Sequence, residues 1–77
     1  MIYVDKAGRM YAVLSWTIPC FREHRMLTKY KIGYRDDPNG EWMRYPVSSW
    51  FDTEEDAVLE LREFARKKGW KPIKGRG

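Results

Sequence analysis

The chain has 77 residues and a net charge of +4, with 43% hydrophobic and 34% charged residues, a composition typical of one small folded domain. The longest stretch without a charged residue, residues 10–21, is too short to cross a membrane, and the first residues lack the basic and apolar regions of a signal peptide. The single cysteine, Cys20, excludes an internal disulfide. We therefore expect a cytoplasmic domain that does not contact a membrane.

The first third of the chain is predicted to contain two strands. Residues 2–4 form a short apolar strand, and residues 5–8 have the composition of a turn. Residues 9–17 are apolar on both alternating sets, which is typical of a central strand. Residues 18–27 contain Pro19 and a run of charges, so we expect a loop there.

A hairpin is predicted over residues 28–47. Residues 28–35 alternate between apolar and basic side chains, residues 37–40 (Asp-Pro-Asn-Gly) form a strong turn, and residues 41–47 return as an edge strand that Pro46 limits. The four-residue loop pairs Tyr34 with Met43 and Ile32 with Tyr45, because a slip of one residue would mix apolar and basic side chains on both faces. The face opposite the apolar one then carries Lys29, Lys31, Arg35, Trp42 and Arg44.

A helix is predicted over residues 53–68. Its apolar stripe, acidic first turn and basic last turn agree, with Asp52 or Thr53 as the N-cap and Gly69 as the terminator. The expected fold class is α+β, a three- or four-stranded antiparallel sheet with one C-terminal helix packed on one face. We expect a single domain over residues 1–70 and a basic C-terminal tail over 71–77. The large aromatic residues assigned to the core are Trp16, Trp50, Phe51 and Trp70.

The sequence contains no motif that indicates an enzyme. Cys20 and His24 are four residues apart, but a buried cysteine and an exposed loop histidine explain them better than a nucleophile pair. Phosphate-binding loops, dinucleotide fingerprints and metal-ligand spacings are missing from the sequence. We therefore expect a protein with no enzymatic activity, no cofactor and no metal.

The positive charge is concentrated at the C-terminal end. Six basic residues and no acidic residue follow Glu63, so residues 1–65 carry a net negative charge. The helix dipole favours bases in the last turn, and a nucleic acid would favour the same bases, so both causes remain open. Within the tail, Lys71 and Lys74 are the candidate phosphate contacts.

Three short segments carry a resemblance to a known family. They are residues 30–35 (Tyr-Lys-Ile-Gly-Tyr-Arg), 40–42 (Gly-Glu-Trp) and 51–57 (Phe-Asp-Thr-Glu-Glu-Asp-Ala). With them, residues 28–65 resemble the DNA-binding domains at the N-termini of tyrosine integrases and the related plant ethylene-response-factor domains. In those families the sheet lies in the major groove with the helix behind it. The resemblance implies that Lys31, Arg35, Trp42 and Arg44 face DNA.

Two functions follow as hypotheses. The first is a small module that binds double-stranded DNA through the basic sheet face and tail, where the contacts would be Lys29, Lys31, Arg35, Trp42, Arg44, Lys71 and Lys74. The second is a phage or mobile-element accessory protein, similar to the anti-CRISPR class, that inhibits or recruits a host protein. Its anchors would be Trp42, Trp50 and the loop 21–25. Either a monomer or a homodimer is compatible with these patterns.

Overall fold

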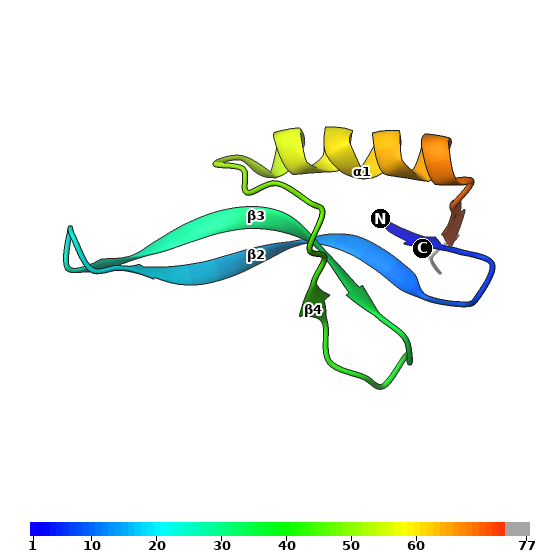
Figure 1. The fold of residues 1–77 in the computed structure, drawn as a ribbon, viewed down its shortest axis with the longest axis horizontal. Coiled ribbons are helices and arrows are strands. Elements are labelled where there is room, and N and C mark those ends of the chain that lie inside the picture. Colours follow the sequence, from blue (N-terminus) through cyan, green and yellow to red (C-terminus); the bar gives the residue numbers. More distant parts are fainter. Residues whose placement is uncertain (74–77) are drawn as a thin grey trace.

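A computed structural model describes residues 1–73 of the chain. Its elements are, in order, β1 (Ile2–Val4), β2 (Met10–Cys20), β3 (Arg25–Arg35), β4 (Met43–Arg44), α1 (Glu54–Lys68) and β5 (Lys71–Ile73). The strands form one antiparallel sheet in the order β4-β3-β2-β1-β5, and α1 lies along one face of it (Figure 1). The α+β fold with a single C-terminal helix is therefore confirmed, with five strands where three or four were expected.

Residues 18–27 are not a loop, contrary to the prediction. β2 and β3 pair without interruption from Met10 opposite Arg35 to Cys20 opposite Arg25, and only residues 21–24 form the turn. Pro19 is tolerated because β1 pairs only with residues 10–12 of β2, so beyond them β2 is an edge strand and a missing N–H breaks no ladder on that side. The result is a long hairpin that projects beyond α1 (Figure 1).

The register predicted for the second hairpin is confirmed. Tyr34 lies opposite Met43, and the Tyr45 amide donates to the Ile32 carbonyl. The returning strand is shorter than expected, because regular pairing stops after Arg44 and the chain then makes a turn in which the Ser48 amide donates to the Tyr45 carbonyl. It rejoins the edge of β3 at Phe51, which exchanges two backbone hydrogen bonds with Tyr30.

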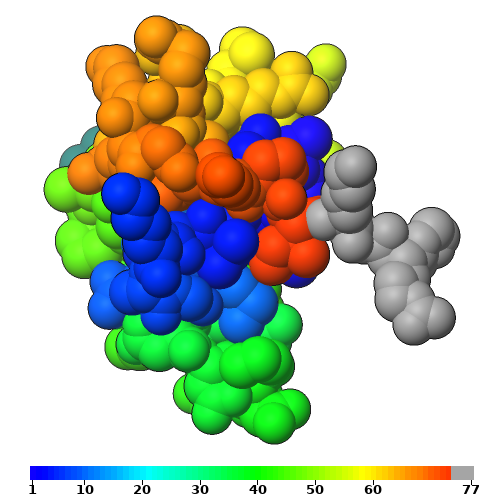
Figure 2. Space-filling view, turned by 90° about the vertical axis from the view of Figure 1, so that its right-hand side faces the viewer, coloured from blue at the N-terminus to red at the C-terminus, as the bar shows by residue number. Residues whose placement is uncertain are grey.

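The sheet continues past residue 70. Gly69 ends α1 in the left-handed conformation (φ 76°), and the Trp70 amide donates to the Ala65 carbonyl, which turns the chain back toward the sheet. Residues 71–73, expected to open a tail, pair with β1 as β5 (Figure 2, where β5 is orange-red beside the blue N-terminal strand). The rest of that expected tail, including Lys74, lies outside the described residues.

The core lies between α1 and the sheet. It is built from Tyr11, Ile32, Leu61, Ala65 and Trp70, and the rings of Tyr11 and Trp70 stack with centroids 3.7 Å apart. Trp70 is therefore a core residue, as predicted. At the other end of the helix, the Thr53 hydroxyl accepts a hydrogen bond from the Asp56 amide, so Thr53 and not Asp52 is the N-cap.

The hydroxyl of Tyr11 fixes the first turn to this core. It donates to Asp5 Oδ2 at 2.9 Å, while Asp5 Oδ1 accepts from the amides of Ala7 and Arg9. Burial, together with the hydrogen bond to Asp5, raises the pKa of Tyr11 to about 12. Burial acts to raise the pKa of Asp5, but the hydrogen bonds from Tyr11 and the two amides outweigh it and lower that pKa.

The variant Tyr11→Phe tests this link. Removing the hydroxyl should lower the free energy of unfolding by about 1 kcal/mol near neutral pH, since one hydrogen bond to a carboxylate is lost. The folded-state pKa of about 12 exceeds the unfolded value. The hydroxyl therefore stabilises fully below about pH 10, and the difference between variant and wild type should vanish as the pH rises toward 12.

Urea denaturation across this pH range measures the difference. The matched control is Tyr34→Phe, because the Tyr34 hydroxyl makes no hydrogen bond with residues 1–73. A constant difference between Tyr11→Phe and wild type at every pH would contradict the assignment.

Candidate nucleic-acid interface

The sheet face that points away from α1 carries the side chains expected to bind DNA. On β2 and β3, Tyr11, Val13, Ile32 and Tyr34 pack toward the helix, so the alternate residues point to the other side. The pairing places Trp16 beside Lys29, Leu14 beside Lys31, Met10 beside Arg35 and Gly33 beside Arg44. We call this side the outer face of the sheet.

Three tryptophans and two arginines on the outer face form a cluster, which we call the Trp–Arg surface. The Arg35 guanidinium lies 4.5 Å from the ring centre of Trp42. The Arg44 guanidinium lies 5.5 Å from the ring centre of Trp16 and 5.3 Å from that of Trp50. All three distances lie within the range of cation–π attraction, so the rings hold the two guanidinium groups against the sheet.

Trp16 and Trp50 were expected in the core, and the structure places both on the outer face. Trp50 is 40% exposed. Trp16 is half-buried, and its Nε1 donates to the Lys31 carbonyl at 3.2 Å. Along β2, Trp16 alternates with Tyr11 and Val13, so it must point to the opposite face of the sheet. The sequence analysis could not use this alternation, because it predicted a loop at 18–27 and so did not predict that β2 pairs with β3.

Lys31 lies on the outer face, but its side chain is buried there. The residue is 6% exposed, and its ammonium donates to the Ser48 carbonyl and lies 5.0 Å from the Trp50 ring centre. Burial lowers the pKa of Lys31; the charge of Glu60 opposes this shift and that of Arg44 adds to it. Lys31 therefore anchors the chain after β4, and its ammonium is not presented to a phosphate.

Ser48 joins the same segment to both layers of the fold. Its hydroxyl accepts from the Ile32 amide at 3.1 Å and lies 2.6 Å from a carboxylate oxygen of Glu60 on α1. Glu60 also accepts from the Ser49 amide. The segment that carries Trp50 is thus tied to β3 on one side and to the helix on the other.

The remaining predicted contacts differ in availability. Lys29 forms an ion pair with Asp52, which partly neutralises it. Lys71 is exposed on β5 opposite Val4, in the cross-strand row that continues through Met10 to Arg35. Arg35 is half-buried, and its Nε is enclosed without a hydrogen-bond partner among residues 1–73. Arg44 is exposed and is the cation that the Trp–Arg surface presents most openly.

The two sides of the molecule carry different charge patterns. The first turn of α1 carries the exposed acids Glu54, Glu55 and Asp56, and the rest of its exposed surface carries Arg62, Arg66, Lys67 and Lys68 beside Glu63. On the outer face Asp52 pairs with Lys29, while Arg35 and Arg44 form no ion pair within residues 1–73. An anion that approaches this molecule is therefore attracted to the sheet and repelled by the first turn of the helix.

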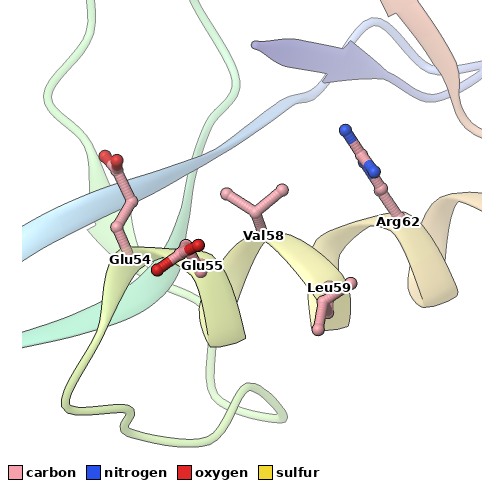
Figure 3. Close-up of a pocket in the computed structure, with 5 residues that line it drawn as sticks. All are labelled: Glu54, Glu55, Val58, Leu59 and Arg62. Atoms are coloured by element: carbon pink, nitrogen blue, oxygen red, sulfur yellow. The ribbon is translucent and has the colours of Figure 1, made fainter.

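The hollows and charged groups elsewhere in residues 1–73 do not bring together as many candidate binding side chains as the Trp–Arg surface does. A hollow of about 320 Å³ is lined by α1 residues alone, with Glu54, Val58 and Arg62 one turn apart along it (Figure 3). Residues 1–73 contain no group of three or more side chains suited to hold a metal ion. Within the same range, no helix combines the length and the apolar character that a membrane span requires.

No family model, curated protein or solved structure matches this chain. The resemblance to the integrase and ethylene-response-factor domains therefore stays a prediction.

At Gly33 of β3, the side chains of the outer face pack directly against the backbone. A Cβ there would lie 2.7 Å from Leu14 Cδ1, 3.1 Å from the Trp16 ring and 3.2 Å from the Met43 carbonyl oxygen. Replacing a strand glycine usually stabilises, because the unfolded chain loses freedom. We expect the opposite for Gly33→Ala, a loss of about 1–3 kcal/mol, because Trp16 and Leu14 must move.

Chemical denaturation followed by tryptophan fluorescence measures the stability, and the spectrum of the folded protein reports on its four tryptophans together. Gly40→Ala is the matched control, because a Cβ at Gly40 would meet only Asp37 of its own turn, at 3.2 Å from the carbonyl oxygen, and neither Trp16 nor Leu14. A Gly33→Ala variant as stable as wild type would show that the cluster packs loosely over β3.

Proposed function

We propose that this chain binds double-stranded DNA through the Trp–Arg surface. The observation that carries the proposal is the position of Trp16, Trp42, Trp50, Arg35 and Arg44 on the sheet face that points away from α1. Cations on that face neutralise phosphates and release counterions. Lys71 extends the same face toward β5.

Arg44 is the residue placed best to contact DNA. Its guanidinium lies within cation–π distance of two indole rings, so its orientation is restricted before binding and less side-chain entropy is lost on contact. The edges of a stacked guanidinium still present N–H donors, which suit phosphate oxygens or the O6 and N7 atoms of guanine. The exposed Trp50 ring adds an apolar surface for sugars or bases.

A protein partner is the second candidate. Tryptophan and arginine are also the residues enriched at binding hot spots, and the apolar side chains of Met43 and Val47 are 58% and 61% exposed close to Arg44 in the sequence. An acidic protein would satisfy the same cations. Salt dependence alone does not separate the two candidates, so the experiment below uses DNA directly.

Arg44→Ala should weaken binding to a labelled mixed-sequence duplex by about fivefold or more, since one charge-assisted contact is lost. The slope of log affinity against log salt concentration should fall by about 0.9 if that contact is to a phosphate. Trp50→Ala should weaken binding while leaving the slope unchanged, because no charge is removed. Fluorescence anisotropy at about 50 and 200 mM salt measures both quantities.

The matched control is Arg62→Ala, an exposed arginine on α1, and denaturation curves verify that all variants are folded. An equal loss in Arg62→Ala and Arg44→Ala would indicate attraction by net charge alone. Tighter binding to a single strand than to the duplex would replace duplex DNA by single-stranded nucleic acid as the ligand. Wild-type protein that binds neither form would direct the search to a protein partner.

A further inference from the structure

The distal part of the β2–β3 hairpin, residues 17–28, is an unsupported two-stranded ribbon, which we call the hairpin arm. β1 pairs with β2 only as far as Ala12, and the edge chain beside β3 makes its last bridge at Tyr30. The arm therefore extends past the helix, along the longest dimension of the molecule, which is 41 Å against 26 and 25 Å for the other two (Figure 1).

The tip of the arm is apolar and exposed. Phe21 is 83% exposed and Met26 59%. Together with Pro19, Cys20, His24 and Arg25, they line a shallow hollow of about 240 Å³. A two-stranded ribbon has no second layer in which to bury these side chains, and such ribbons are only marginally stable alone. These exposed side chains give the projecting element an apolar surface that another molecule can contact.

The charges of the arm indicate an anionic partner. Arg22 is exposed beside Phe21, and Arg25 follows three residues later. The one acid of the tip, Glu23, is held by Arg25 with 2.6 Å between Nε and Oε1, which reduces its repulsion of an anion. His24 takes a positive φ of 53° to complete the turn.

The arm also continues the outer face of the sheet. Cys20 beside Arg25 and Ile18 beside Leu27 lie in the same alternation as Trp16 beside Lys29, which leads directly to the Trp–Arg surface. A ligand bound along the outer face would therefore meet the arm next. The major groove of duplex DNA is wide enough to admit a two-stranded ribbon.

We propose that the hairpin arm enters a groove of the bound duplex and that Phe21 inserts between two adjacent base pairs and bends the DNA. This inference rests on the function proposed above. Apolar wedges partly unstack a base step and kink the duplex by about 20–90°, while neighbouring arginines hold the flanking phosphates. Phe21 supplies the wedge and Arg22 the phosphate contact.

Two signals on labelled duplexes test this inference with the full chain. Energy transfer between dyes on the two ends of the duplex should rise when wild-type protein binds, because bending brings the ends closer. The fluorescence of 2-aminopurine placed in the duplex should rise as a base unstacks. Phe21→Ala should abolish both signals and weaken duplex binding by about fivefold or more, with an unchanged salt slope because no charge is lost.

The controls separate the wedge from folding and from the Trp–Arg surface. Phe21→Leu should keep most of the bending, since leucine also acts as a wedge. Leu59→Ala, which removes an exposed apolar side chain from α1, should bend DNA like wild type. Phe21 is exposed, so its replacement leaves the core intact.

Two results would overturn the inference while the proposed function stands. One is wild-type protein that binds the duplex without bending it. The other is a Phe21→Ala variant that bends and unstacks DNA as wild type does. Wild-type protein that binds no DNA at all would instead contradict the proposed function, and the inference that rests on it would fail with it.

Discussion

One helix of 15 residues has to cover a five-stranded sheet, and it covers only one face. On that face the apolar residues of α1 pack against Tyr11 and Ile32, and Trp70 closes the end of the core by stacking on Tyr11. The other face has no second layer among residues 1–73 and must still shield the backbone of β2 and β3. Most of the arrangement of this molecule follows from that asymmetry.

On the outer face, large side chains that are exposed to water on one side shield the backbone of β2 and β3. Leu14 and the Trp16 ring lie over Gly33, where a glycine leaves room for them. Arg44 covers Trp16 and Trp50, and a guanidinium loses less hydration than an ammonium when it lies on a ring. The same side chains that stabilise the sheet therefore present an aromatic and cationic surface, so the proposed DNA contact needs little rearrangement before binding.

The segment between β4 and α1 couples this surface to the core. The Ser48 hydroxyl forms hydrogen bonds with the Ile32 amide of β3 and with Glu60 of the helix. The Lys31 ammonium donates to the Ser48 carbonyl and also lies against the Trp50 ring. A lysine buried in this way loses solvation, which the carbonyl and the ring offset in part. Trp50 is thereby held in place although it is itself exposed, and the position of α1 bears directly on the geometry of the Trp–Arg surface.

Local chemistry explains which parts of the fold and the site were predictable from the sequence. The turn at 37–40 and the caps of α1 carry strong short-range signals, so the second hairpin register and the helix follow from them, and with them the common face of Lys29, Arg35 and Arg44. The turn at 21–24 has no glycine or proline, and His24 adopts positive φ without such a signal. The β2–β3 register therefore could not be predicted from the sequence. Without that register, neither the position of Trp16 on the outer face nor the burial of Lys31 could be predicted.

The position of the basic residues limits what the net charge of +4 can explain. Arg66, Lys67 and Lys68 occupy the last turn of α1, where the helix dipole stabilises them, and Arg66 also pairs with Glu63. Lys71 instead lies in β5, within the sheet. Much of the C-terminal basic excess thus has a structural cause. The charges that bear on DNA binding are the few that the outer face and the hairpin arm present beside aromatic rings, where position matters more than number.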